Sequence, residues 1–265
     1  MSDATIIANL ALDRVDGGEW TPGGCPTFAR PALAAIGAQG TLITSCGVQD
    51  RARFADTAAD ELVLDRHTTR FEIDYSGDER AMVLHSIGHR WMPEDVARLS
   101  IETEWVHLAP LTRADFPVET VAALAGRHRV CFDGQGLVRR AHIGPLELDA
   151  EFDPQLLTHL SALKLADDEA GIVGRGASRD QLAERLGVPE LIFSHGSRGA
   201  ALWCQGTLTE FEPQHVARGN VTGAGDTLMT AFVVGRERGH DPVQATRAAM
   251  DVVENVLKAR EERRA

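Results

Sequence analysis

The sequence predicts one three-layer α/β/α domain with a mostly parallel sheet, and three observations support this fold class. A chain of 265 residues has the length of a single large α/β domain. Apolar, strand-like runs at 105–109 and 129–133 flank a helical segment at 115–126, which favours parallel strands joined by a right-handed crossover. Two alternating segments, at 69–75 and 80–87, flank a short glycine-containing loop and predict an inserted β-hairpin.

Charge and composition exclude several classes of function. The 27 basic and 39 acidic residues give a formal net charge of −12, which argues against nucleic acid or an anionic membrane as the main partner. No apolar run reaches membrane-spanning length, and the N-terminus lacks the basic start and apolar core of a signal peptide, so we expect a cytoplasmic protein. The four cysteines show no Cys-x-x-Cys spacing, which argues against a zinc site or a disulfide framework.

The first strand is expected to be a buried run over Thr5–Asp13 that ends in a carboxylate. Open α/β sheets place substrate contacts at strand ends, so Asp13 is a candidate substrate-binding residue. The alternative is that Asp13 only opens the turn at 14–18. A second buried strand is expected at 41–47, with a helix starting at Asp50.

A glycine-rich segment at 222–227, with the sequence TGAGDT, precedes an apolar helical stretch. Gly223, Ala224 and Gly225 bring several backbone N–H groups into one bend, and N–H groups at a helix start suit an anion such as phosphate. Asp226 would lie in the first helical turn, where the helix dipole favours its ionised form. A carboxylate beside such a pocket fits phosphoryl transfer, with Asp226 taking the proton of the attacking hydroxyl. The alternative is a structural glycine turn with an acidic cap.

The segment 222–227 resembles the C-terminal signature of the ribokinase/PfkB carbohydrate kinase family. Other segments follow that family's order over nearly the whole chain. The resemblance implies a ribokinase-like fold, with Asp226 as the catalytic base and the N–H groups of Gly223, Ala224 and Gly225 as the anion hole. It also implies ATP as the phosphoryl donor and Mg²⁺ as the metal.

Gly23 and Gly24, leading into an alanine-rich helix, resemble the N-terminal signature of the same family. Glycines let the backbone approach a sugar closely because they carry no Cβ. The resemblance implies that Asp13, Gly23 and Gly24 bind the substrate. Ribokinases carry a lysine and an asparagine after the glycine pair, whereas this chain has Cys25 and Phe28, which argues against ribose itself.

The predicted hairpin fits the small β-lid that family members fold over the substrate, here formed from about 13–22 and 69–88. The apolar face of such a ribbon needs a partner, so a homodimer through the lid is also expected. The segments 80–90 and 133–139 resemble the inositol-kinase-like branch of the family. Gln135 follows a strand end and is a further candidate substrate contact.

The segment 190–200 resembles the family's Thr-x-Gly-x-x-Gly sequence, whose backbone lies along the nucleotide. The resemblance implies that Ser194, Gly196 and Gly199 border the nucleotide, together with Thr222.

The family carries Asn-x-x-Glu where another strand enters a helix, and this chain has Ala166 and Glu169 there. The resemblance implies that Glu169 positions magnesium through water. The alternative is that Glu169 is a routine partner of the helix dipole.

Together these features predict an ATP- and magnesium-dependent kinase acting on a hydroxyl group of a sugar, a cyclitol such as inositol, or a nucleoside. The alternative is a catalytically impaired relative that binds a sugar or nucleotide in a regulatory role. Ala166 and Asn220, which replace residues usual in the family, motivate this alternative, and the intact segment 222–226 argues against it.

Overall fold

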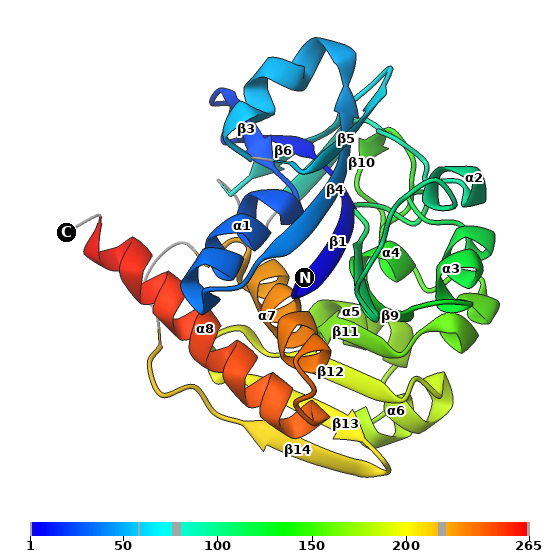
Figure 1. Cartoon of the computed structure of the whole chain (residues 1–265), viewed down its shortest axis with the longest axis vertical. Helices are drawn as coiled ribbons and strands as arrows, with labels where there is room; N and C mark the ends of the chain where they lie inside the picture. The colour runs from blue at the N-terminus through cyan, green and yellow to red at the C-terminus, as the bar shows by residue number, and fades with distance from the viewer. Residues whose placement is uncertain (1, 58, 76–80, 217–220, 264–265) are drawn as a thin grey trace.

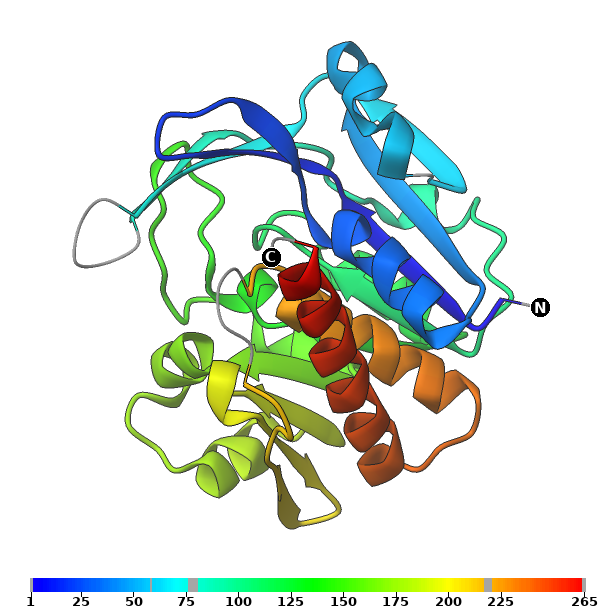
Figure 2. The ribbon, with the colours of Figure 1, turned by 90° about the vertical axis from the view of Figure 1, so that its left-hand side faces the viewer.

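A central β-sheet runs through the protein between two layers of helices, and a second sheet extends from one end of it (Figures 1 and 2). The structure is a computed structural model that describes residues 2–57, 59–75, 81–216 and 221–263. The predicted α/β fold with a mostly parallel sheet is confirmed.

The described residues form a nine-stranded central sheet in the spatial order β14-β13-β12-β11-β9-β8-β1-β4-β5. The strands from β12 through β5 pair in parallel, and β13 and β14 add an antiparallel edge. Helices cover both faces, so the inner strands are buried throughout, as continuous apolar runs predict. The strands are β1 (Ala4–Asn9), β4 (Gly40–Gly47), β5 (Glu61–Asp65), β8 (Trp105–Ala109), β9 (Arg129–Asp133), β11 (Ala162–Ala166), β12 (Glu190–Ser194), β13 (Ala200–Cys204) and β14 (Thr207–Phe211).

One face of the central sheet is covered by α1 (Cys25–Ile36), α7 (Ala224–Glu237) and α8 (Pro242–Glu262). The middle of α7, from Thr227 through Gly235, is entirely buried because α7 lies between the sheet and the two other helices. The start of α7 is therefore held on several sides.

Shorter helices cover the opposite face and pack on a second apolar core. The stacked rings of Trp91 and Phe116, 6.2 Å apart, lie within this core. These helices are α2 (Pro93–Val96), α3 (Val118–Ala125), α4 (Gln135–Val138), η2 (Pro154–His159), α5 (Asp167–Gly174) and α6 (Arg179–Leu186). Two 3₁₀-helices lie elsewhere: η1 (Val48–Thr57) packs Phe54 in a separate apolar cluster, and η3 (Gly196–Arg198) forms the turn between β12 and β13.

The second sheet has five strands in the order β10-β7-β6-β2-β3 among the described residues. Four of them overlap the segments 13–22 and 69–88 predicted to form a lid, and the lid role of this sheet stays a prediction. The antiparallel pairing of β6 with β7 confirms that hairpin, whose turn at 76–80 lies outside the described residues. Phe71 and Leu84 pack on Leu111 of the main body. A homodimer through this sheet stays a prediction. Its strands are β2 (Ala11–Val15), β3 (Trp20–Gly23), β6 (Thr69–Asp74), β7 (Ala81–Ser86) and β10 (Gly144–Pro145).

The expected single strand over Thr5–Asp13 is wrong, because the chain changes sheets at Leu10. β1 ends at Asn9 in the central sheet, and β2 begins at Ala11 in the second sheet. Asp13 therefore lies within a lid strand rather than at the end of a core strand.

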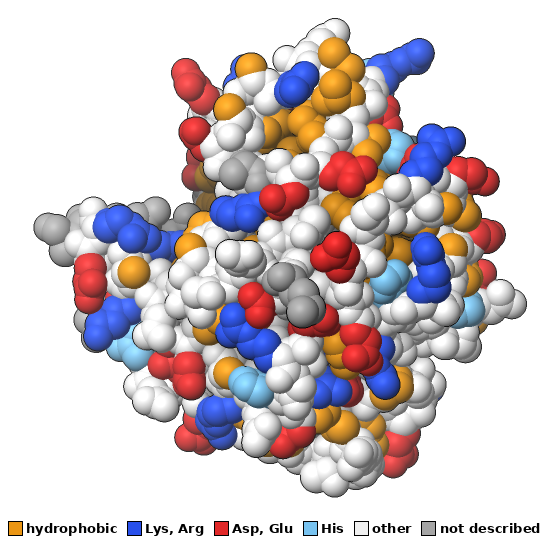
Figure 3. Space-filling view, in the orientation of Figure 1, with side chains coloured by type: hydrophobic (Ala, Val, Ile, Leu, Met, Phe, Trp, Pro, Cys, Tyr) orange, Lys and Arg blue, Asp and Glu red, His pale blue; other side chains and the backbone are white. Residues whose placement is uncertain are grey.

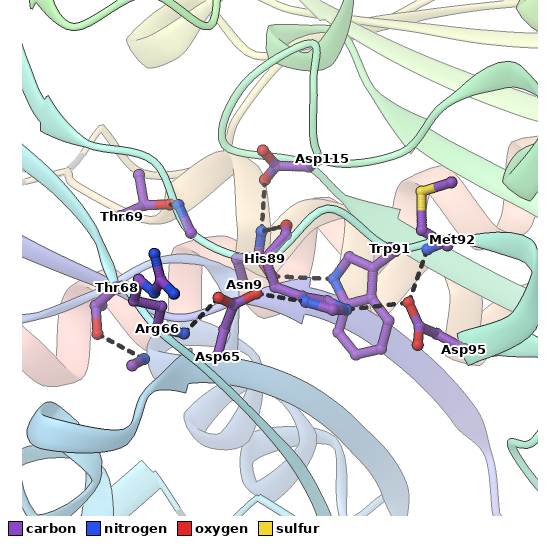
Figure 4. Close-up of polar contacts among 12 residues, drawn as sticks. Asn9, Asp65, Arg66, Thr68, Thr69, His89, Trp91, Met92, Asp95 and Asp115 are labelled. Atoms are coloured by element: carbon purple, nitrogen blue, oxygen red, sulfur yellow. Dashed lines mark hydrogen bonds and ion pairs between the residues drawn. The ribbon is translucent and has the colours of Figure 1, made fainter.

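Polar contacts of Asn9 fix the place where the chain changes sheets (Figure 4). Its amide donates to the carbonyl oxygen of His89 over 2.7 Å and to Oδ2 of Asp115 over 3.1 Å. Its side-chain oxygen accepts from Nε1 of Trp91 over 3.0 Å. These hydrogen bonds tie the end of β1 to the segments around His89 and Asp115. Directly after this point the chain leaves the central sheet and enters the second sheet as β2.

Two helices differ from the sequence expectation. The helix expected from Asp50 is a 3₁₀-helix, and the one expected from Asp115 begins only at Val118. The reason for the later start is that the Asp115 carboxylate accepts from the amide of Leu111 and from the hydroxyl of Thr112.

The face shown in Figure 3 carries interspersed acidic and basic side chains rather than one continuous basic patch. Within the described part of the chain, no helix is long and apolar enough to cross a membrane.

The buried carboxyl of Asp115 gives a test of the fold through pH. Burial raises its pKa from 3.8 to about 6, although hydrogen bonds from Leu111, Thr112 and Asn9 act in the opposite direction. A carboxyl with a raised folded-state pKa stabilises the protein below its unfolded-state pKa and loses this contribution as the pH rises through the folded-state value. We expect the unfolding free energy of the parent, relative to Asp115→Asn, to fall by about 3 kcal/mol between pH 4 and roughly pH 6.5. Urea denaturation of both proteins across this range measures it, and a difference that does not change with pH would contradict the prediction.

Candidate active site

The starts of α1 and α7 meet near the carboxyl ends of the parallel strands (Figure 1). The ring of Phe28 lies against Gly223 so closely that a Cβ added there would overlap it. The buried thiol of Cys25 interacts electrostatically with the carboxylate of Asp226. Two helix N-termini therefore direct their positive dipole ends at one region.

The first turn of α7 presents the amides that the sequence assigned to an anion hole. Gly223 has a φ of 79°, a left-handed conformation that glycine adopts without strain. The amide of Ala224 donates to the carbonyl oxygen of Val221 over 3.1 Å, so it already has an acceptor. The amides of Gly225 and Asp226 belong to those that a helix leaves without an intrahelical acceptor. The predicted anion-binding role of Gly223, Ala224 and Gly225 stays a prediction, and of these amides that of Ala224 is already engaged by Val221.

Asp226 is half-buried, and its charge depends on its neighbours. Burial and the Asp133 carboxylate raise its pKa above the ordinary value. The positive charge of Lys164, together with His107 and Cys25, opposes this rise. A raised pKa makes a carboxylate a better proton acceptor, which suits a general base.

His107, Asp133 and Lys164 form a buried row beneath α7. Nε2 of His107 lies 3.0 Å from Oδ2 of Asp133, and Nζ of Lys164 lies 3.3 Å from Oδ1 of the same carboxylate. Lys164 and Asp133 are register partners in the parallel pair of β11 and β9. A Cβ added at Gly225 would lie 3.2 Å from Nζ of Lys164, which places the ammonium group directly below Gly225. No motif in the sequence marks this row, because the row depends on the register of β9 and β11.

The carboxylate of Glu169 is fixed at the start of α5. Its Oε2 accepts from the amide of Ala166 over 2.7 Å, and a Cβ added at Gly134 would lie 2.8 Å from that oxygen. Glu169 therefore makes the contact expected of a helix-capping residue. The role of Glu169 toward magnesium stays a prediction. Among the described residues, no group of three or more His, Cys, Asp or Glu side chains is arranged to hold a metal ion.

Asp13, Gly23 and Gly24 come together where the lid joins α1. The carboxylate of Asp13 lies over Gly23, where an added Cβ would overlap it. Gly24 precedes α1 with a φ of 84°, and a Cβ there would lie 2.8 Å from the carbonyl oxygen of Asn9. The glycine pair thus lets the backbone pass close to Asp13, and Cys25 follows it directly. The glycine pair therefore leads directly into Cys25, the residue that interacts with Asp226.

Gln135 begins α4 directly after β9 and is half-buried. It follows Asp133 at the carboxyl end of that strand, as expected for a residue beside the crevice. Its contact with substrate stays a prediction.

A small cavity of about 130 Å³ lies beside the first turn of α7. Residues 190–200, which were predicted to border the nucleotide and are called the donor segment below, supply Ser194, Gly196 and Gly199 to its wall. Glycine is required at Gly199 because a Cβ there would overlap the carbonyl oxygen of Phe211. Ala224 and Gly225 also line it, together with apolar residues of α7 and α8, which are Leu228, Met250, Val253 and Leu257.

Thr222 is exposed, and its carbonyl oxygen accepts from Nη1 of Arg260 on α8 over 2.8 Å. The guanidinium group of Arg260 also lies 5.5 Å from the centre of the Phe28 ring. Arg260 therefore ties the approach to α7 to both α8 and α1. Asn220, which motivates the impaired alternative, lies outside the described residues.

His195 links the donor segment to α5. Its Nδ1 lies 2.6 Å from Oδ1 of Asp167, whose other oxygen accepts from Arg198 over 2.6 Å. These partners lower the pKa of Asp167 against the opposing effect of its burial. The contact fixes the glycine turn beside the cavity, a role that only the folded arrangement reveals.

Comparison with known proteins gives one family match and many structural matches. The model of the pfkB family carbohydrate kinases matches residues 145–256, which include α5, the donor segment and the start of α7. The predicted resemblance to the pfkB carbohydrate kinases is confirmed. Phosphoryl transfer to a hydroxyl group, the activity of this family, is supported by the match. No curated protein sequence matches the chain significantly.

Solved structures of pfkB-type kinases share the fold over almost the whole chain. A pyrophosphate-dependent kinase of the ribokinase family, in a sulfate complex, is 25% identical with a TM-score of 0.83, and the match covers 96% of this chain and 95% of that one. Such a kinase complexed with a pyrophosphate analogue and myo-inositol is 24% identical with a TM-score of 0.82, over 96% and 95% of the two chains. The Arabidopsis thaliana ribokinase complexed with ribose and ATP is 17% identical with a TM-score of 0.68, over 97% and 99%.

The fit of Gly223 beneath Phe28 gives a second prediction. Gly223→Ala should lower kcat by about tenfold or more, because the Cβ overlaps the ring and the left-handed φ is strained for alanine. The control is Gly171→Ala within α5, where a Cβ meets nothing within 4 Å. Activity and thermal midpoints of both variants measure the effect. Equal kcat values for both would contradict the assigned role of this turn.

Proposed function

We propose that the protein transfers the γ-phosphoryl group of ATP, with Mg²⁺, to a hydroxyl group of a small polyhydroxy substrate: a sugar, a cyclitol such as inositol, or a nucleoside. The observation that carries this proposal is the position of Asp226 in the first turn of α7, next to the amides of the anion hole and the thiol of Cys25. The family match over this region supports it.

Asp226 acts as the base in this scheme. Its carboxylate takes the proton from the acceptor hydroxyl while that oxygen forms a bond to the γ-phosphorus. The bond between the γ-phosphorus and the bridging oxygen breaks, and ADP leaves with the electron pair. The amides of Gly225 and Asp226 stabilise the charge on the transferring group, because helix N-termini bind such anions.

Magnesium, when bound, neutralises charge on the donor phosphates. It retains several waters and is commonly held by one or two carboxylates together with substrate phosphates. The single fixed carboxylate of Glu169 fits a contact made through water. The hydrogen bond from Ala166 holds that carboxylate at the start of α5.

The cavity beside α7 favours ATP as donor. Its walls at Leu228, Val253 and Leu257 are apolar, which suits the flat face of a purine and serves no purpose for pyrophosphate. The competing donor is pyrophosphate, because two of the structures above are pyrophosphate-dependent kinases. The Arabidopsis ribokinase complexed with ATP shows that the fold also accommodates a nucleotide.

On the acceptor side, Asp13 with Gly23 and Gly24 would hold substrate hydroxyl groups beneath the lid. Carboxylate and backbone groups suit hydroxyl donors and acceptors alike. Cyclitols are favoured within the substrate class by the structural match to the kinase complexed with myo-inositol.

The catalytic scheme predicts that Asp226→Asn lowers kcat by about two to four orders of magnitude, because the base is removed without a change of shape. The assay is release of ADP or phosphate across a panel of inositols, hexoses, pentoses and nucleosides, with each donor. Asp251→Asn on the exposed side of α8 is the matched control. A folded Asp226→Asn protein that turns over at the parent rate would refute the mechanism, and substrate binding without turnover in the parent would favour the impaired alternative.

The donor is tested by filling the cavity. Val253→Trp should raise KM for ATP by about tenfold or more and leave pyrophosphate-driven turnover unchanged, because only a nucleotide needs the cavity. Val243→Trp, at an exposed position near the start of α8, is the control. An unchanged KM for ATP in Val253→Trp would show that the base does not bind there.

A further inference from the structure

Lysine is almost absent from this chain, although arginine is abundant. Of the 27 basic residues, only Lys164 and Lys258 are lysines. Lys258 is exposed on α8, whereas Lys164 is 7% exposed in the central sheet. Arginine is planar and holds its charge in a wide fork, whereas the ammonium group of lysine is compact.

The surroundings of Lys164 contain more negative than positive charge. Its Nζ lies 3.3 Å from Oδ1 of Asp133, and its charge also interacts with Glu169 on α5 and Asp226 on α7. Burial lowers the pKa of Lys164, but the three carboxylates outweigh burial and raise the pKa above its ordinary value. Lys164 is therefore charged at neutral pH.

Asp226 and Lys164 belong to one cluster of interacting side chains. Besides Asp226 from α7, the cluster contains Cys25 from α1, His107 from β8, Asp133 from β9, Lys164 from β11 and Glu169 from α5. Of these, Asp133 and Lys164 are the oppositely charged pair in the row beneath Asp226. The carboxylate of Asp133 is held by His107 through one oxygen and by Lys164 through the other.

We propose that Lys164 and Asp133 are positioning residues that control the charge of Asp226 with opposite sign, Lys164 favouring its ionised form and Asp133 its protonated form. This inference rests on the proposed function, because it concerns the base of that reaction. The pair lies below the anion hole and works through Asp226 and Gly225 rather than by contact with the acceptor.

The two substitutions should act in opposite directions. Lys164→Met removes a positive neighbour, so the ionised form of Asp226 is less stable and its titration midpoint rises by about one to three pH units. Asp133→Asn removes a negative neighbour, so the midpoint falls. The double variant, in which no buried charge of the pair is left unpaired, should titrate between the two. A merely structural role would not produce shifts of opposite sign.

The direct measurement is ¹³C NMR of protein labelled at the aspartate carboxyl carbons, with the signal of Asp226 assigned from Asp226→Asn. The parent, the two single variants and the double variant are titrated without donor or metal. Lys258→Met is the matched control and should leave the midpoint unchanged. Labelled lysine gives a second readout, because the chain contains only two lysines. An exposed lysine titrates near pH 10.4, and the signal of Lys164 should stay that of an ammonium group above this pH.

Shifts in the same direction, or no shift in either single variant, would overturn the proposal. If Lys164→Met does not fold, the double variant must titrate at higher pH than Asp133→Asn, and an equal or lower midpoint would also overturn it. The acid limb of kcat/KM should move with the NMR midpoint. If the parent shows no turnover with any donor, the proposed function fails, but the NMR midpoints still decide the proposal on Asp226.

Discussion

The first turn of α7 depends on a balance of charges that are shielded from water. Burial and the Asp133 carboxylate favour the protonated form of Asp226 and raise its pKa. The charge of Lys164, together with His107 and Cys25, acts in the opposite direction. The charge of Asp226 therefore depends on side chains from several elements of the fold.

The rest of the fold keeps this turn in place. The register of β9 and β11 puts Asp133 and Lys164 side by side, and α8 is tied to the approach to α7 through Arg260. On the substrate side, the change of sheets at Leu10 brings Asp13 over the glycine pair. Each contact joins segments that are distant in sequence, so the site forms only when the whole sheet has assembled.

Much of the fold could be predicted from the sequence, because the strands and helices leave strong local patterns. The hairpin of β6 and β7, the crossover through α3 and the glycine turn before Asp226 are each visible in a short stretch of chain. The break between β1 and β2 was not predictable, because 5–13 reads as one apolar run. It depends on Asn9 meeting His89 and Asp115 from far along the chain.

The candidate site shows the same division. Site residues in glycine-rich segments, such as Gly23 and Gly225, could be predicted from the sequence, because glycine marks places where the backbone approaches other groups closely. It did not bring out Lys164, whose role follows from burial and register rather than from a motif. The capping contact of Glu169 and the engaged amide of Ala224 also depend on geometry that no spacing reveals.

The most direct test of the central claim is a crystal structure with Mg²⁺, ADP, aluminium fluoride and an acceptor polyol that supports turnover. The account predicts that the fluoride group lies on the amides of Gly225 and Asp226, with one acceptor oxygen within about 3 Å of the Asp226 carboxylate. A trapped group bound elsewhere, or an acceptor oxygen that faces a different side chain, would contradict it.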